Sequence, residues 1–197
     1  MSLKLITETS YDIELNESKG SGDMYIVGIF SSAEQKNANG RVYKKDTLDR
    51  EFKRINEEFF KTGVPLWGQL DHPTSADSSM EKVAIRTLAL EWRGNDLYGK
   101  AKILTDTPNG AIAAALLKES KRIGISSRGL GEVSEDGYVK DESYKLITWD
   151  IVGNPSCSGA WVKGIYEGYN VEDTLVELSK TRNNYYKKII KLLEKFK

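Results

Sequence analysis

An imidazole and a hydroxyl could together perform acyl-transfer chemistry in this chain. His72 is the only histidine among the 197 residues and lies in the segment Trp67-Gly68-Gln69-Leu70-Asp71-His72-Pro73. Imidazole titrates near neutral pH, so it can take a proton from a hydroxyl and return it to a leaving amine. A lone histidine is more often a hydrogen-bonded surface residue, so the role of a base depends on a suitable partner.

The hydroxyl partner is expected in Gly124-Ile125-Ser126-Ser127-Arg128-Gly129, where two serines end a short apolar strand and a glycine follows. Glycine allows a substrate carbonyl to approach backbone N–H groups that bind an oxyanion. Neighbouring side chains of a strand point to opposite faces, so only one of the two serines can meet His72. A structural role for both serines before a turn is the alternative.

Asp150 is the candidate third member of this group. It stands in the apolar segment Leu146-Ile147-Thr148-Trp149-Asp150-Ile151-Val152, where burial of an unpaired carboxylate would be costly. A carboxylate held against the imidazole would set its tautomer and stabilise the charge that it acquires. The alternative is an aspartate at a strand edge that faces water.

Two other chemistries are less well supported. Cys157 could act as a thiol nucleophile with His72, but Pro155-Ser156-Cys157-Ser158-Gly159 offers no basic activation. One cysteine and one histidine do not make a zinc site of the usual ligand count, and the acidic residues have no calcium-loop or two-metal spacing. We therefore expect neither a metal nor an organic cofactor.

The composition narrows the class of protein. Lys+Arg and Asp+Glu both total 29, so no net charge attracts nucleic acid. The apolar runs are too short to cross a membrane, and the N-terminal residues lack the pattern of a secretion signal. These features predict a soluble, intracellular protein.

The expected elements alternate irregularly between strands and helices. Strands are predicted over 23–31, 123–127 and 144–152, with a hairpin of 82–92 and 97–104. Asp46 is the expected cap of a helix to about residue 62, and Thr107-Pro108 begins a second helix. Its expected apolar stripe comprises Ala111, Ile112, Ala115, Leu116 and Leu117. This order predicts an α+β fold with an antiparallel sheet that can close into a barrel.

Three regions are expected along the chain: a flexible leader over 1–22, a catalytic domain over 23–168 and a helical tail over 169–197. The tail contains no Gly or Pro after residue 170 and carries many charges among its leucines and isoleucines. Its open roles are packing on the core, packing on another copy in a homo-oligomer, and removal during maturation.

Four separated motifs resemble one family. They are Asn37-Ala38-Asn39-Gly40-Arg41-Val42-Tyr43, the segment 68–73 with the histidine, the Ser-Ser-Arg-Gly run at 126–129, and the segment 149–156. Together they are similar to the prohead core serine proteases of T-even-like tailed bacteriophages, over most of residues 23–165. The resemblance implies a compact antiparallel β-barrel flanked by helices, similar to the herpesvirus capsid maturation proteases.

The resemblance also implies roles for residues. His72 is the base, and Ser127 is the nucleophile because the family's serine tends to be followed by glycine one residue later; Ser126 is the fallback. Asp150 takes the third position, for which Thr148 is the alternative. The backbone N–H groups of Arg128 and Gly129 are the expected oxyanion donors.

The implied substrates are scaffold, internal and capsid proteins inside a prohead in the bacterial cytoplasm, cut after glutamate in (Leu/Ile)-x-Glu. The chain contains this pattern at Glu8, Glu17, Glu177 and Glu194, which suggests self-processing. Arg86, Arg122 and Arg128 are unranked partners for the substrate glutamate. The alternative function is a catalytically inactive scaffold or capsid-assembly protein that binds partners through its helical tail.

Overall fold

The computed structural model describes residues 4–10, 23–74, 76–120, 122–153 and 161–166. This part contains eight strands and two α-helices, together with short π- and 3₁₀-helical turns. In chain order the strands and helices are β1 (Lys4–Ser10), β2 (Met24–Ser32), α1 (Lys45–Ile55), β3 (Leu66–Gln69), β4 (Val83–Arg93), β5 (Asp96–Ile103), α2 (Pro108–Ser120), β6 (Ile123–Gly131), β7 (Lys145–Val152) and β8 (Trp161–Tyr166).

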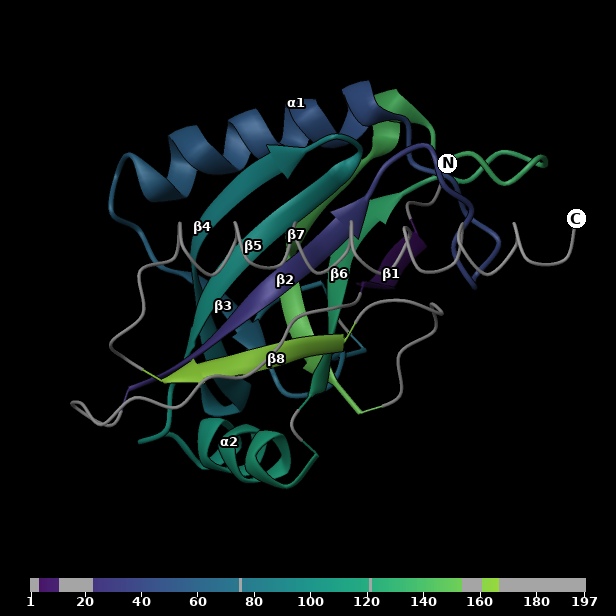
Figure 1. The fold of residues 1–197 in the computed structure, drawn as a ribbon. Coiled ribbons are helices and arrows are strands. Elements are labelled where there is room, and N and C mark those ends of the chain that lie inside the picture. Colours follow the sequence, from purple (N-terminus) through teal and green to yellow (C-terminus); the bar gives the residue numbers. More distant parts are fainter. Residues whose placement is uncertain (1–3, 11–22, 75, 121, 154–160, 167–197) are drawn as a thin grey trace, which may run out of the picture.

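The strands form one sheet whose ladders are all antiparallel, in the order β1-β6-β8-β2-β5-β4-β3. Strand β7 lies off this path and pairs with β6. Helix α1 lies across one end of the sheet and α2 across the opposite end (Figure 1). The α+β class is thus confirmed. The hairpin of β4 and β5, turned at Gly94 with φ +60°, and the strands predicted over 23–31 and 144–152 are confirmed as well.

The expected closed barrel is wrong, because no ladder joins β3 to β7 within the described residues. The two strands meet through the isolated bridge between Leu70 and Ile151. Side chains of β7 form hydrogen bonds with backbone groups of β3 instead. Thr148 Oγ1 donates to the Trp67 carbonyl at 2.7 Å, and the Gln69 N–H donates to Asp150 Oδ1 at 2.9 Å. The sheet therefore curls until its edges touch, and a seam of side-chain hydrogen bonds replaces the last ladder.

The core lies inside the curled sheet. Trp149 of β7 is fully buried, and its Nε1–H donates to the Phe30 carbonyl of β2 at 2.9 Å. The Phe30 and Trp149 rings lie 5.7 Å apart between centroids. Strands that are not neighbours in the sheet thus face each other across the core. The contacts between Trp149 and Phe30 fix the distance between β7 and β2.

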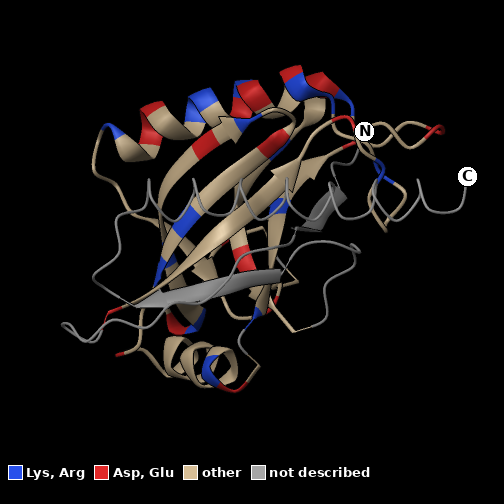
Figure 2. Cartoon of the chain, viewed as in Figure 1, with Lys and Arg blue, Asp and Glu red and all other residues tan. Residues whose placement is uncertain are grey.

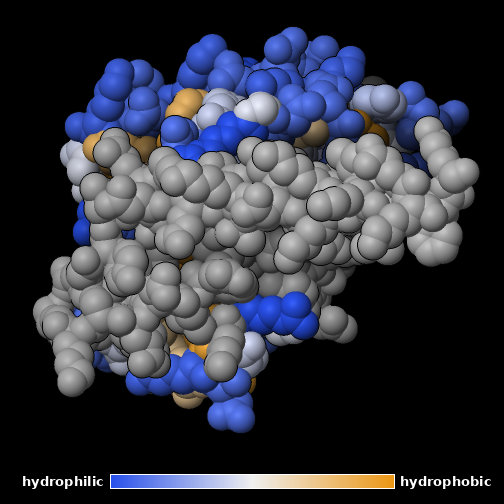
Figure 3. Space-filling view, in the orientation of Figure 1, coloured by the Kyte–Doolittle hydropathy of each residue, from blue (hydrophilic) through white to orange (hydrophobic). Residues whose placement is uncertain are grey.

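Helix α1 packs through one apolar side. Leu48 and Ile55 are buried, as expected, and Phe52 is partly buried against the core. The α-helix ends at Ile55, before the expected residue 62, and Phe59 and Phe60 pack against the core from the π-helical turn Asn56–Phe60 that follows. Charged residues of both signs cover its outer side, and the surface over it is mainly hydrophilic (Figures 2 and 3). The predicted cap at Asp46 is wrong: Lys44 is the N-cap, and Asp46 lies in the first turn, where a carboxylate complements the helix dipole.

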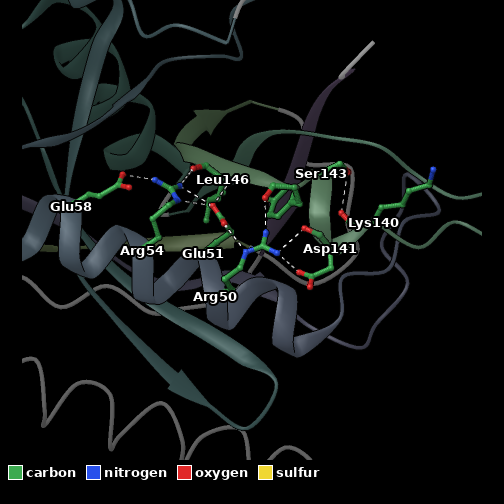
Figure 4. Close-up of polar contacts among 9 residues, drawn as sticks. Arg50, Glu51, Arg54, Glu58, Lys140, Asp141, Ser143 and Leu146 are labelled. Atoms are coloured by element: carbon green, nitrogen blue, oxygen red, sulfur yellow. Dashed lines mark hydrogen bonds and ion pairs between the residues drawn. The ribbon is translucent and has the colours of Figure 1, made fainter. Parts of the chain in front are cut away.

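Helix α1 is attached to β7 by a buried carboxylate (Figure 4). Glu51 is 3% exposed, and its Oε2 accepts the Leu146 N–H at 2.9 Å and Arg54 Nη2 at 2.8 Å. Arg54 also donates to the Leu146 carbonyl at 2.5 Å. Leu146 lies at an irregularity in the β6–β7 ladder, so two side chains of α1 bind its backbone groups at the free edge of β7.

Helix α2 faces the core with a side other than the predicted one. Its buried residues are Gly110, Ala113, Ala114 and Leu117, whereas Ile112 and Leu116 are 48% and 49% exposed. A Cβ on Gly110 would lie 1.9 Å from the Leu104 carbonyl oxygen, so contact with the preceding loop sets the helix rotation. Because α2 carries apolar residues of its own on several sides, their spacing did not identify the side that is buried.

The first strand departs from the predicted flexible leader. Residues 4–10 form β1, which pairs with β6 from Lys4 opposite Gly131 to Ser10 opposite Ile125. The rest of the leader, Cys157 and the tail over 169–197 lie outside the described residues. No helix among the described residues is long and apolar enough to cross a membrane.

Candidate active site

Strand β7 supplies a buried carboxylate at the seam. Trp149 and Ile151 point into the core, so the alternation of a strand turns Thr148 and Asp150 to the other face. Asp150 is fully buried. Its Oδ1 accepts the Gln69 N–H, and its Oδ2 faces the loop after β3.

The close approach of β3 to β7 brings His72 to this carboxylate. A Cβ at Gly68 would lie 2.0 Å from the Trp149 carbonyl oxygen, so only glycine fits there. Asp71 then takes a left-handed conformation with φ +60°, which aspartate tolerates better than most residues. Its N–H donates to the Ile151 carbonyl at 2.7 Å. The turn at Asp71 therefore places the His72 imidazole next to β7.

The imidazole lies between the carboxylate and a hydroxyl. His72 Nδ1 is 2.9 Å from Asp150 Oδ2, and its Nε2 is 2.5 Å from Ser126 Oγ. A carboxylate only accepts, so Nδ1 carries the proton and Nε2 accepts from the serine hydroxyl. The His72 side chain is 21% exposed, which leaves the ring open to solvent on one side. This arrangement can deprotonate the hydroxyl and stabilise the resulting imidazolium.

The hydroxyl at the imidazole belongs to Ser126 and not to Ser127, which the sequence pattern favoured. Ser126 lies opposite Asp150 in the β6–β7 register, whereas Ser127 lies opposite Trp149. Successive side chains of a strand alternate, so Ser127 points to the other face of β6, where it is also buried. The spacing of a serine to the next glycine carries no information about this facing.

Arg128 lies on the same face of β6 as Ser126, two residues further on. Its side chain is fully buried and its Nε is 2.7 Å from Asp150 Oδ2, so it is not available to bind a substrate glutamate. The backbones of Arg128 and Gly129 run between β1 and β7. Their N–H groups therefore lie in the plane of the sheet, and their role as oxyanion donors stays a prediction.

Three other residues singled out in the sequence lie in the sheet or next to it. The Thr148 hydroxyl donates a hydrogen bond to the Trp67 carbonyl. Asp150, and not Thr148, accepts the hydrogen bond from the His72 imidazole. Arg86 pairs with Trp67 and Lys102 within the sheet, and Arg122 precedes β6. Among the described residues no three His, Cys, Asp or Glu side chains gather as a metal site would require.

A serine hydroxyl, an imidazole and a buried carboxylate in one hydrogen-bonded line define a serine hydrolase of the triad type. The family model for prohead core protein serine proteases matches residues 4–170. The chain belongs to this family, and it is a phage prohead serine protease.

Two relatives agree with this assignment. The prohead core protein protease of Enterobacteria phage T4 is 36% identical over 170 residues, which span 81% of this chain and 80% of the relative. The solved structure of the bacteriophage T4 capsid assembly protease, gp21, superimposes with a TM-score of 0.68 at 30% identity. That match covers 79% of this chain and all of the solved one.

Proposed function

We propose that the chain is an endopeptidase with Ser126 as nucleophile, His72 as base and Asp150 as the third member of the triad. The observation that carries the proposal is the pair of contacts made by one imidazole, to Ser126 Oγ at 2.5 Å and to Asp150 Oδ2 at 2.9 Å. The substrates are scaffold, internal and capsid proteins inside the prohead, cut after glutamate in (Leu/Ile)-x-Glu.

The reaction follows from the positions of the three groups. His72 Nε2 takes the hydroxyl proton while Ser126 Oγ attacks the backbone carbonyl carbon of the substrate glutamate. Asp150 stabilises the imidazolium at Nδ1, and Nε2 then gives the proton to the leaving amine. Water, deprotonated by the same nitrogen, hydrolyses the acyl-enzyme and releases the new carboxyl terminus.

The two serines provide the sharpest test. Ser126→Ala should lower kcat on a Leu-x-Glu peptide by about 10⁴-fold or more, because the nucleophile is removed. Ser127→Ala, a matched change at the neighbouring buried serine, should keep kcat and labelling by a fluorophosphonate. Activity retained by the first variant and lost by the second would return the role to Ser127.

Self-processing at Glu8 is part of the proposal. In the β1–β6 register Glu8 lies opposite Ser127 and Thr9 opposite Ser126. The peptide bond that follows Ile6-Thr7-Glu8 therefore runs alongside the strand that carries the nucleophile. The same pattern also occurs at Glu57, Glu119 and Glu132 within the described residues, and at Glu17, Glu167, Glu177 and Glu194 outside them.

Mass spectrometry of the full chain after incubation tests this step. We expect a new N-terminus at Thr9 in the unaltered chain, and an uncut bond in Glu8→Gln because the recognised charge is lost. Ser126→Ala should also remain uncut. An active enzyme that keeps residues 1–8 after prolonged incubation would contradict self-processing at this site.

A further inference from the structure

We propose that Arg128 is a positioning residue that sets the geometry of the His72–Asp150 pair from beneath the site. The inference rests on the proposed function and assigns a role to a side chain that contacts neither the nucleophile nor the imidazole in the contacts described above. Arg128 has 0% exposure, as has Asp150, so both charges lie outside the reach of water. A buried guanidinium requires partners for all of its donors.

One side of the guanidinium holds the carboxylate. Nε donates to Asp150 Oδ2 at 2.7 Å and Nη2 donates to Oδ1 at 3.2 Å, which is a two-point contact between planar groups. The same two oxygens accept from His72 Nδ1 and from the Gln69 N–H. Four donors thus surround Asp150, and its plane is set independently of the imidazole.

The other side of the guanidinium holds the loop that follows the histidine. Nη1 donates to the carbonyls of Ala76 and Asp77 at 2.5 and 3.3 Å, and Nη2 donates to Ser78 Oγ at 3.0 Å. These contacts account for the five N–H groups of the side chain. One residue therefore fixes both the acceptor of the imidazole proton and the chain that leads away from His72.

Arginine suits this position for a geometric reason. A lysine has the charge but only three donors around one atom, so it cannot contact both carboxylate oxygens and three loop acceptors. We therefore expect Lys at this position to preserve charge compensation for Asp150 while releasing the loop. Gln would lose both.

The single histidine makes the inference directly measurable. In the full chain labelled with ¹⁵N-histidine, the one downfield Nδ1–H proton signal reports the hydrogen bond from His72 to Asp150. We expect Arg128→Gln to shift or abolish this signal and to lower kcat by about 10²-fold with little change in KM, because the ring is misplaced by a fraction of its contact distance. Arg128→Lys should recover part of the signal and part of kcat.

Arg54→Gln is the matched control, because Arg54 also holds a buried carboxylate and a backbone carbonyl, at Glu51 and Leu146. It should lower stability and leave the proton signal and kcat of the folded enzyme unchanged. If both Arg128 variants fail to fold, Ser78→Ala decides, since it removes one loop acceptor from the same guanidinium. A smaller change of the same kind is then expected.

An unchanged proton signal and kcat in a folded Arg128→Gln, or in Ser78→Ala if the arginine variants do not fold, would overturn the inference. The failure of the proposed function gives a different result. In that case the unaltered chain would not cleave the Leu-x-Glu peptide, while the proton signal would still show whether Arg128 holds the ring.

Discussion

Asp150 joins three separate parts of the chain through two oxygen atoms. It accepts hydrogen bonds from the end of β3, from His72 and from Arg128 on β6. A fully buried carboxylate is unfavourable by itself, and these donors offset the loss of its hydration. The residue therefore serves the reaction and the fold together.

Asp150→Asn should impair both. We expect kcat to fall by about 10⁴-fold, because the amide can leave the imidazole in the wrong tautomer, as in other triads. The free energy of unfolding should fall by about 3 kcal/mol, because the Arg128 guanidinium loses its buried counter-charge. Peptide cleavage and urea unfolding measure the two effects.

Asp136→Asn is the control at an exposed turn, where a hydrogen bond from Ser134 lowers the pKa of the Asp136 carboxyl. This variant should keep kcat. A normal kcat in Asp150→Asn as well would remove the aspartate from the triad.

At the scale of elements, α1 is attached to β7 near the start of the strand, at Leu146. Glu51 and Arg54 bind both backbone groups of Leu146, where the β6–β7 ladder is irregular. The helix thus completes a strand edge with side chains. The amphipathic pattern of the helix predicted its buried side, but it gave no sign that a charged residue on that side is buried.

Glu51→Gln should weaken this attachment. The amide cannot compensate the charges of Arg50 and Arg54 while it accepts the Leu146 N–H, so we expect a loss of about 3 kcal/mol in the free energy of unfolding. Urea unfolding measures it. Glu57→Gln breaks an exposed ion pair with Lys61 in the turn that follows α1. It should change the free energy of unfolding by less than about 1 kcal/mol. Equal effects in the two variants would contradict the role given to Glu51.

At the scale of the whole molecule, the site forms where the curled sheet fails to close by a ladder. The seam between β3 and β7 brings together backbone groups and side chains of residues about 80 positions apart in sequence, as in the contacts of Trp67 with Thr148 and of Gln69 with Asp150. The missing ladder is thus connected with the chemistry, because the side chains that replace it include the carboxylate of the triad.

Gly68→Ala should open this seam. The new Cβ would lie 2.0 Å from the Trp149 carbonyl oxygen and 2.7 Å from Ile85 Cγ1, so β3 must move away from β7. We expect a loss of about 3 kcal/mol in stability and a decrease of about 10²-fold in kcat, because His72 moves with β3. Thermal unfolding and peptide cleavage measure these changes.

Gly153→Ala is the matched control, because no atom of the described residues lies within 4 Å of its Cβ position. It should leave both quantities close to their original values. If Gly68→Ala behaved in the same way, the seam would not control the position of His72.

The sequence by itself determined the chemistry that was available and the family. One histidine, one short serine segment and one aspartate among apolar residues indicated a serine protease, and local β-branched, aromatic and turn residues predicted most strands, because these signals depend on neighbours in the chain. The buried side of α2, the strand β1 and the open seam were missed.

Only the tertiary structure decided which serine meets the imidazole and what supports the aspartate. Ser126 and Ser127 are neighbours in a strand, so their side chains point to opposite faces of the sheet. Which of them faces His72 depends on the register of β6 with β7. The period also places Arg128 on the face of Ser126, but its partners, Asp150 and the loop at 76–78, come from distant parts of the chain. Local sequence cannot specify these contacts, because they exist only after β3 and β7 have been brought together by the core.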